Sequence, residues 1–368
     1  MNSSSIKVGI IGCGMISNTY IKHCKTFPIL EIVHCADRNP ERSAAKAAEY
    51  GIPQHGSVEQ LLADSEVDLV VNLTTPRGHA SVNLAAIAAG KHVFCEKPFS
   101  INLDEGLPVL AAARAKGVLI GCAPDTFFGP PHQTCRKLID DGAIGAPVAA
   151  VAFMACHGWE DGHPNPAFYY DIGGGPMFDM GPYYLAALVN LMGPMKRVSG
   201  SAKITSPTRT LTKPSHPLYR TQIEVKAPTH LSGTIDFQNG AIATVMMSFD
   251  VWAQHLPCIE IYGTEGTLVL PGIGTGGEVL LRRSEHREWR NMPITHTSIC
   301  SQGAAIADMA YALREGRAHR ANGEMACHLV DAMQAFEDSS REGRHVELST
   351  TCAQPAALSP GLEVGVIG

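Results

Sequence analysis

A glycine-rich turn near the N-terminus has the residue types and spacing needed to hold a pyrophosphate. Six consecutive residues after an apolar strand form it: Gly12, Cys13, Gly14, Met15, Ile16 and Ser17. Gly12 permits a tight turn, Gly14 lets a pyrophosphate approach the backbone, and the start of the following helix favours the anion. Ser17 replaces the third glycine of the usual fingerprint, but it is small enough for close helix–strand packing. We expect a dinucleotide to bind at this turn.

An acidic residue at the end of the second predicted strand supports the same hypothesis. Asp37 lies roughly 20 residues beyond the turn, where a carboxylate can accept hydrogen bonds from a ribose diol. It favours NAD, because a 2′-phosphate beside it would cost at least about 1 kcal/mol even in water. Arg38 and Arg42 could pair with that phosphate, so NADP remains an alternative. The competing interpretation is a plain strand–turn–helix with an unrelated surface aspartate.

A lysine follows the fourth predicted strand in the tripeptide Glu96-Lys97-Pro98. Ligands of open α/β sheets bind at the carboxyl ends of the strands, which would place Lys97 near the nicotinamide. Its ammonium can donate a proton to a carbonyl, and its neutral amine can take one from a hydroxyl. Pro98 could fix the lysine backbone through a cis bond. Taken alone, however, this tripeptide is common on protein surfaces.

A loop between residues 157 and 170 mixes flat rings with hydrogen-bonding groups. Pyranose rings present apolar C–H faces and a rim of hydroxyls, so this mixture suits a sugar. The candidate substrate-binding residues are His157, Trp159, His163 and Tyr169. His157 and His163 could instead bind a metal with Glu160 or Asp161, but the spacing fits no common zinc pattern, and we predict no metal. A loop that merely packs on a sheet is the third interpretation.

The elements that must position these residues fall into two patterns. Residues 1–145 alternate strands and helices with near-continuous apolar strands, which predicts a parallel sheet covered on both faces. The expected strands are Lys7–Ile11, Glu31–Ala36, Asp68–Leu73, His92–Cys95 and Val118–Cys122. The expected helices are Met15–Lys25, Pro40–Tyr50, Ser81–Ala89, Leu103–Lys116 and Pro131–Asp141.

After Pro147 the pattern becomes a series of strands with turn signals, of which Asn239-Gly240 is the strongest. The expected strands are Val148–Cys156, Lys196–Thr205, Leu231–Asp236, Ile242–Phe249, Cys258–Tyr262 and Thr267–Leu270. The expected helices are Asp179–Met192, Ala304–Glu315 and Gly323–Ser340. We therefore predict an α/β protein: a Rossmann domain (1–145), a substrate-binding α/β domain with a mostly antiparallel open sheet (146–348), and a loose tail (349–368). The C-terminal helices are expected to pack partly on the first domain.

Composition excludes several classes of protein. Of the 368 residues, 45% are hydrophobic and 17% charged, which excludes a disordered chain and a coiled coil. The net charge of −6 gives no global attraction to nucleic acid or anionic membrane. We see no signal peptide and no apolar run long enough to span a membrane. Eleven cysteines without a CxxC pair indicate buried, reduced thiols and a cytoplasmic protein.

Three segments that follow the glycine turn along the chain resemble, in the same order, motifs of the glucose–fructose oxidoreductase/inositol dehydrogenase/MocA family. They are Thr74–His79, Ala89–Pro98 and Gly173–Tyr183. The resemblance implies a Rossmann domain, a second domain whose open sheet forms homodimers or homotetramers, and NAD(P)-dependent oxidation or reduction of a sugar, polyol or inositol.

The resemblance also implies the roles of individual residues. In the family this lysine works with an aspartate and with a residue four positions later. Lys97 and Asp179 match this pattern, and Tyr183 occupies the position where histidine is commonest in the family. On a helix Asp179 and Tyr183 share a face. The alternative interpretation of Asp179 is a helix N-cap, and that of Tyr183 is a side chain packed in the core. The ordinary tyrosine pKa near 10 makes Tyr183 a poorer base, so proton transfer rests more on Lys97. The remaining candidates for cofactor contact are Thr74, Thr75, Pro76, His79 and Glu96; His79 could instead only cap a helix.

The expected reaction is hydride transfer between the nicotinamide and a carbinol carbon. Lys97 takes the hydroxyl proton, directly or through Tyr183, while Asp179 orients the lysine or a substrate hydroxyl. The first alternative is a redox-neutral glycosidase or eliminase that uses tightly bound NAD through a transient keto-sugar. The second is a non-catalytic cofactor sensor, against which the presence of Lys97 and Asp179 argues.

Overall fold

The chain forms two compact units in a computed structural model that describes residues 5–274, 276–297, 302–363 and 365–367. Unit 1 comprises Met1–Gln133, Thr295–Cys327 and Pro355–Gly368, and unit 2 comprises Thr134–Ile294 and His328–Gln354. The segment Thr295–Cys327 therefore belongs to unit 1, although it lies between the two parts of unit 2 in sequence.

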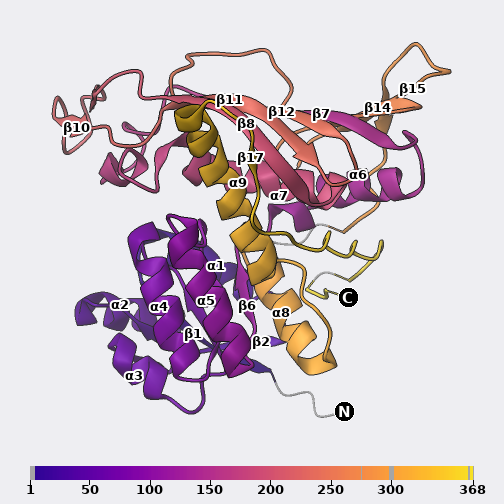
Figure 1. Ribbon diagram of the computed structural model, residues 1–368. Coiled ribbons are helices and arrows are strands. Elements are labelled where there is room, and N and C mark those ends of the chain that lie inside the picture. The colour runs from indigo at the N-terminus through magenta and orange to yellow at the C-terminus, as the bar shows by residue number, and fades with distance from the viewer. Residues whose placement is uncertain (1–4, 275, 298–301, 364, 368) are drawn as a thin grey trace. The chain divides into compact units, whose positions relative to one another are not determined.

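Unit 1 is built on a six-stranded parallel sheet of order β3-β2-β1-β4-β5-β6. Figure 1 labels β1, β2 and β6 of this sheet and the helices α1 to α5. Its strands are β1 Ile6–Ile11, β2 Leu30–Ala36, β3 Gln54–Gly56, β4 Leu69–Asn72, β5 His92–Cys95 and β6 Ile120–Cys122. The helices between them are α1 Met15–Cys24, α2 Pro40–Tyr50, α3 Val58–Ala63, α4 Pro76–Ala88 and α5 Leu103–Lys116. The helix α6 (Pro130–Asp140) follows β6 and contains the boundary between Gln133 of unit 1 and Thr134 of unit 2. The strand order reverses between β1 and β4, which is where a doubly wound sheet binds its ligand. The predicted Rossmann fold is confirmed.

The helix α8 (Ala304–Glu315) is attached to unit 1 by Asp125. This buried carboxylate accepts hydrogen bonds from the backbone N–H groups of Gln302 (2.9 Å), Gly303 (3.0 Å) and Ala305 (3.4 Å). It thereby satisfies donors that the start of a helix leaves unpaired. Burial raises the pKa of Asp125, and these hydrogen bonds oppose that rise.

The C-terminal segment is not the loose tail that its composition suggested. The Arg320 guanidinium donates to the carbonyl oxygens of Ala356 (2.9 Å) and Ala357 (3.2 Å). Leu358 is buried, and its N–H donates to the Gln133 side chain at 2.8 Å. A segment without helix or strand is therefore ordered by polar contacts that sequence periodicity does not reveal.

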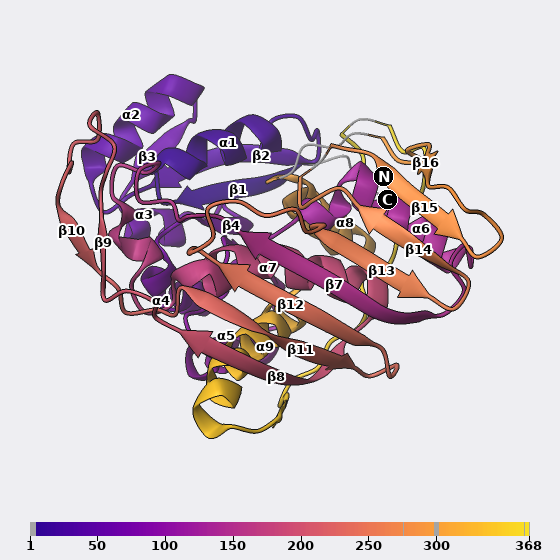
Figure 2. The same cartoon turned by 90° about the horizontal axis from the view of Figure 1, so that it is seen from above.

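Unit 2 contains a nine-stranded sheet of order β16-β15-β14-β13-β7-β12-β11-β8-β17, seen face-on in Figure 2. Its strands are β7 Pro147–Ala155, β8 Met195–Lys203, β11 His230–Phe237, β12 Ile242–Ser248, β13 Ile259–Gly263, β14 Gly266–Leu270, β15 Val279–Arg283, β16 Arg290–Met292 and β17 Val346–Glu347. The strands β7 and β12 pair in parallel, and the other pairs among the described residues are antiparallel. A separate two-stranded ribbon joins β9 (Thr208–Thr210) to β10 (Gln222–Glu224). The predicted mostly antiparallel sheet is confirmed.

Two helices begin earlier than the sequence suggested. In α7 (Gly175–Met192) Pro176 occupies the first turn and Gly174 is the N-cap, so Asp179 lies inside the helix and does not cap it. In α4, Pro76 starts the helix five residues before the expected Ser81. Both errors arose because a proline at the first turn is an easily overlooked start signal. The helix α9 (Gly323–Glu342) begins where expected.

The described residues also show the state of the cysteines and the lengths of the apolar helices. None of the ten described cysteines forms a disulfide, eight of them are buried, and Cys300 lies outside the described residues. Within the described part of the chain, no helix combines the length and the apolar composition that crossing a membrane requires.

Candidate active site

The turn between β1 and α1 is shaped by a close approach of two backbones. Gly12 has a φ of +101°, and a Cβ atom there would lie 2.7 Å from the carbonyl oxygen of Leu73, just after β4. No side chain fits that space, and the backbone conformation itself favours glycine. The turn is also tied to β2, because the Gly12 N–H donates to the Ala36 carbonyl at 2.8 Å.

The start of α1, in contrast, is open. A Cβ atom on Gly14 would meet no described atom within 4 Å, and Gly14 caps the helix without a side-chain hydrogen bond. The next side chain, Met15, is 64% exposed, and the first turn carries no acidic residue. Uncapped N–H donors at an open helix start are what a pyrophosphate requires, so the described residues fit a dinucleotide.

Asp37 fixes the same turn from β2. One carboxylate oxygen accepts from the Cys13 N–H and the other from the Asn39 N–H, both at 2.9 Å. Each oxygen has two lone pairs, so the carboxylate can still accept ribose hydroxyls. Arg38 and Arg42 are exposed beside it. The sequence predicted the ribose role of Asp37 and missed its bond to the glycine turn.

A buried histidine joins the segments that follow β4 and β5. His79 lies inside α4, so the hypothesis that it only caps this helix is wrong. Its Nδ1 lies 2.6 Å from the Pro98 carbonyl oxygen and its Nε2 lies 3.0 Å from that of Thr74. Asn72, which sequence analysis missed, accepts from the Thr74 hydroxyl (2.7 Å) and donates to the His79 carbonyl (3.1 Å). Polar residues at the end of a buried strand are the signal that would have identified it.

Two carbonyl acceptors on one imidazole require both ring nitrogens to carry a proton. Burial alone would lower the pKa of His79, but the negative charge of Cys95 and the two carbonyls raise it to about 9. Burial would raise the pKa of Cys95, yet hydrogen bonding by Cys122 and the His79 charge lower it to about 5. The directions of the two pKa shifts favour a charged His79 ring beside a charged Cys95 thiol.

Glu96 holds the lysine segment in place. One of its carboxylate oxygens accepts from the Tyr20 hydroxyl of α1 (2.9 Å), and the other accepts from the Lys97 N–H (2.6 Å). Burial raises the pKa of Glu96, and the Lys97 charge opposes that rise. The Lys97–Pro98 peptide is cis, as expected, and Lys97 is half-buried.

The predicted residues of unit 1 thus gather at the carboxyl ends of β1, β2, β4 and β5. Thr74 is half-buried, Thr75 is the exposed N-cap of α4, and Pro76 starts that helix. The other members of this edge are Cys13, Met15, Ile16 and Arg38, and they lie at or beside the two turns described above.

The candidates of unit 2 gather at the carboxyl ends of β7 and β12. Beyond these strands, the Cys156 N–H donates to the Ser248 carbonyl (3.0 Å) and the Val251 N–H donates to the Cys156 carbonyl (3.1 Å). The start of α7 lies at the same edge, since a Cβ on Gly175 would be 2.6 Å from the Pro228 carbonyl, just before β11. The loop from His157 onward leaves from this edge.

Asp179 and Tyr183 share the accessible face of α7, as their spacing predicted. These two and Met180 are half-buried, whereas the other residues from Gly175 to Met192 are buried. Burial raises the pKa of the Cys156 thiol, and the charges of Asp179 and Glu160 raise it further. Asp179 therefore acts electrostatically on the first residue beyond β7.

A buried ionic network holds the loop, and its arginine lies far away in sequence. Arg209 of β9 lies 3.7 Å from the Glu160 carboxylate and donates to the Phe249 carbonyl (2.9 Å) and to Asp250. The Tyr170 hydroxyl donates to Glu160, and burial with this hydrogen bond raises the pKa of Tyr170. Sequence analysis missed Arg209 and Asp250, because no local pattern links residues 160, 209 and 250.

The carboxylates needed for the metal hypothesis are engaged in other contacts. Asp161 accepts from the N–H groups of Thr212 and Lys213 at 2.9 Å, and Glu160 belongs to the ionic network. No group of three or more metal-binding side chains occurs among the residues that the structure describes.

The ring-bearing residues of the loop differ in their surroundings. The His163 ring meets Phe168 and Tyr169 edge-on, at centroid distances of 5.1 and 5.8 Å, so this part of the loop packs on itself. Trp159 is exposed. His157 stacks on Trp252, which the sequence analysis also missed.

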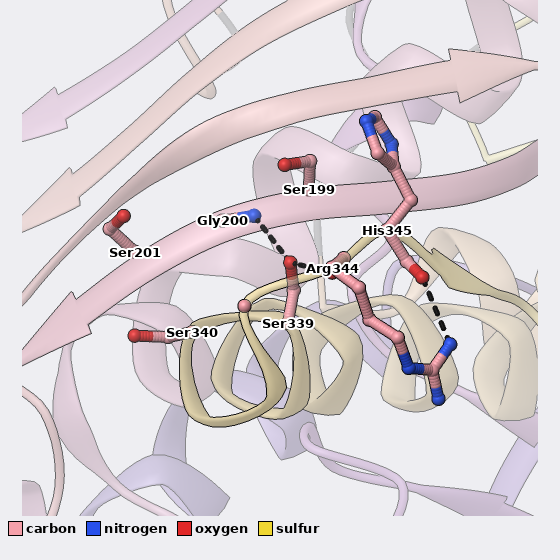
Figure 3. A pocket seen from close by; sticks show the side chains of 8 residues that line it. Ser199, Gly200, Ser201, Ser339, Ser340, Arg344 and His345 are labelled. Atoms are coloured by element: carbon pink, nitrogen blue, oxygen red, sulfur yellow. Dashed lines mark hydrogen bonds between the residues drawn. The ribbon is translucent and has the colours of Figure 1, made fainter.

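A cavity of about 400 Å³ lies elsewhere in unit 2, between β8 and the end of α9 (Figure 3). There Ser339 accepts from the Gly200 N–H and Ser340 accepts from the Ala202 N–H, both at 2.9 Å. The strand β17 is short and leaves these two N–H groups of β8 without a strand partner. The two hydroxyls bind them instead and so protect this edge of the sheet. None of the predicted site residues lines this cavity.

The doubly wound sheet and its glycine turn define the chain as an NAD(P)-binding oxidoreductase. Residues 6–123 match the model of the oxidoreductase family with an NAD-binding Rossmann fold, and residues 132–269 match the GFO/IDH/MocA C-terminal domain. The chain therefore belongs to the GFO/IDH/MocA family.

Named relatives extend over most of the chain. It is 30% identical over 289 residues to 1,5-anhydro-D-fructose reductase of Ensifer adhaerens, covering 75% of this chain and 80% of the relative. It is 27% identical to D-xylose 1-dehydrogenase (NADP(+)) 2 of Haloferax volcanii, covering 86% and 92%. A solved structure of levoglucosan dehydrogenase with NADH and levoglucosan has the same fold, with a TM-score of 0.82, 19% identity, and coverage of 94% and 100%.

The two glycines provide a matched pair of substitutions. We expect Gly14→Ala to fold normally, because its Cβ enters open space and the backbone is extended at φ −75° and ψ −170°. The same Cβ blocks the approach of the pyrophosphate, so the Kd for NADH should rise about tenfold or more. Gly12→Ala should instead lower the free energy of unfolding by more than about 2 kcal/mol. Calorimetric NADH titration and urea unfolding test both; an unchanged Kd for Gly14→Ala would contradict the assignment.

The protonation of His79 can be observed directly. Because its pKa is raised to about 9, both ring nitrogens should carry protons at pH 8, and the ring should become neutral only near pH 9. Histidines of the denatured chain, with pKa values near 6.5, are neutral at pH 8 and serve as the reference. Nitrogen-15 NMR of the imidazole rings makes the measurement, and a neutral His79 ring at pH 8 would disprove the imidazolium.

Proposed function

We propose that this chain is an NAD(P)-dependent dehydrogenase or reductase of a sugar, polyol or inositol that transfers a hydride between the cofactor and a carbinol carbon. The observation that carries the proposal is the position of Lys97 at the end of β5, on the edge that also holds the glycine turn and Asp37. The names of the relatives, a reductase and a dehydrogenase of sugars, support the substrate class and favour net redox chemistry.

Lys97 is the proton donor and acceptor in this proposal. Bound cofactor supplies the hydride acceptor or donor at the same edge. Lys97 takes the proton of the substrate hydroxyl during oxidation and returns it to the carbonyl oxygen during reduction. Glu96, His79 and the Pro98 carbonyl fix the backbone on which the lysine stands, and this positioning favours reaction.

Asp179 and Tyr183 complete the proposed catalytic set from unit 2. Their shared face on α7 supports a joint role, in which Asp179 orients the lysine or a substrate hydroxyl and Tyr183 relays a proton. His157, Trp159, His163 and Tyr169 are proposed to contact the substrate, and of these His163 and Tyr169 also pack on each other. Asp37 favours NAD over NADP by charge repulsion of a 2′-phosphate.

We also propose that the face of the nine-stranded sheet opposite α7 joins copies of this chain. Alternate residues of β7 face α7 and are buried, whereas Val151 and Phe153 on the opposite face are only half-buried. Phe153 pairs there with Met246 of β12, which gives an apolar centre. Sedimentation velocity should find a dimer or tetramer, and Phe153→Asp should reduce it to a monomer. A wild-type monomer at micromolar concentration would contradict this proposal.

The activity test follows absorbance of the reduced nicotinamide with NAD or NADP and a panel of sugars, glycosides and inositols. We expect a rise in proportion to the substrate consumed. Consumption of a glycoside without a net rise would contradict net oxidation and would point to redox-neutral cycling on bound NAD.

Lys97→Ala tests the proton-transfer role. Loss of a general acid–base group should lower kcat about 10²- to 10⁴-fold. Cofactor affinity, measured by calorimetry, should stay within about threefold, because the glycine turn and Asp37 are untouched. The exposed Lys116 of the same unit provides the matched control, and Lys116→Ala should retain activity. An unchanged kcat for Lys97→Ala would overturn the mechanism.

A further inference from the structure

Trp252 is an exposed aromatic side chain that stacks on one neighbouring ring. It is 82% accessible, which is unusual for the largest apolar side chain. Its ring lies parallel to that of His157, with centroids 3.3 Å apart and an interplanar angle of 14°. One face of the indole is therefore covered by the imidazole, and the other face is open.

The backbone on both sides of this ring pair is anchored. The Val251 N–H donates to the Cys156 carbonyl at 3.1 Å, which brings the residues before Trp252 and His157 together. Asp250 accepts from Arg209 and from the Thr229 hydroxyl (2.7 Å). The buried network that contacts Glu160 thus also anchors the backbone just before Trp252, which reduces the conformational freedom that is lost on binding.

The ring pair lies at the edge of unit 2 that carries the proposed catalytic residues. His157 directly follows Cys156, whose N–H donates to the Ser248 carbonyl at the end of β12. The first turns of α7, which carry Asp179, begin at the same edge beside Pro228. A half-buried carboxylate and an open aromatic face at one edge are complementary to the two kinds of surface on a pyranose, its hydroxyl rim and its C–H face.

We infer that the open face of Trp252 is a stacking platform for the C–H face of a cyclic sugar, and that it makes this chain selective for ring forms over open-chain polyols. The inference rests on the proposed function, whose substrate class it narrows. A protein partner is the competing occupant, because Leu256 near Trp252 is exposed as well, whereas Gln254 and His255 between them are polar. The self-association measurement below decides between the two.

The first test is kinetic and uses the pyranose that gives the fastest NADH formation. Trp252→Ala should raise KM about five- to tenfold with kcat within about threefold, and Trp252→Phe, which keeps a flat ring, should restore most of the loss. The preference for the pyranose over D-glucitol, as a ratio of kcat/KM, should fall by a similar factor. The exposed Trp289 between β15 and β16 is the matched control, and Trp289→Ala should change neither value.

The second test does not need turnover. Saturation-transfer NMR with 1,5-anhydro-D-glucitol and the wild-type protein plus NADH should label the ring C–H protons, and the signal should vanish in Trp252→Ala but persist in Trp289→Ala. If this holds while no sugar is oxidised, the platform stands and the proposed activity fails. If sugars are oxidised and Trp252→Ala matches wild type in both tests, the platform is overturned and the activity stands. Loss of self-association in Trp252→Ala would also overturn it, as the ring would then be a subunit contact.

Discussion

Gly12 has no room for a Cβ atom, and the sheet edge formed by the carboxyl ends of β1, β2, β4 and β5 depends on this constraint. The turn after β1 lies against the carbonyl of Leu73, after β4, at the point where the strand order of the parallel sheet reverses. This contact leaves α1 open at its start, beside the ends of β2, β4 and β5. A side chain at Gly12 would push the turn away from Leu73 and separate the elements that together form the edge.

Buried polar side chains convert this edge from a set of loops into a fixed surface. Asp37, His79 and Glu96 each bind groups from two different segments, and each is wholly or largely inaccessible. Such groups are costly to bury unless their partners are complete, so they favour one arrangement of the loops over others. In unit 2, Arg209 does the same for the loop between residues 157 and 170 and for Asp250, which precedes Trp252 by two residues.

The sequence predicted the position of a residue correctly where that position depends only on residues nearby in the chain. The turn Gly12–Ser17, the strand ends and the shared face of Asp179 and Tyr183 follow from short-range periodicity, and the structure agrees with them. The family assignment rested on motifs of this kind. Helix starts at Pro76 and Gly175 were missed because the first-turn prolines, not the later apolar residues, mark them.

What the sequence could not supply depends on contacts between distant segments. Arg209 meets Glu160 and Asp250 only after β9 folds beside the loop, and Trp252 meets His157 only because β7 and β12 pair in parallel. Asp125 binds the start of α8, although most of the residues of unit 2 lie between them in the sequence. Each contact requires the strand pairing to be known first, which periodicity does not give.

The most direct test of the central claim is to follow deuterium from the substrate. The most active pyranose, deuterated at every carbon-bound position, is incubated with the protein and NAD, and the reduced cofactor is analysed by mass spectrometry. The account predicts one deuterium in each NADH formed, in proportion to the sugar oxidised. Sugar converted without deuterium in the free cofactor would contradict net hydride transfer at this edge.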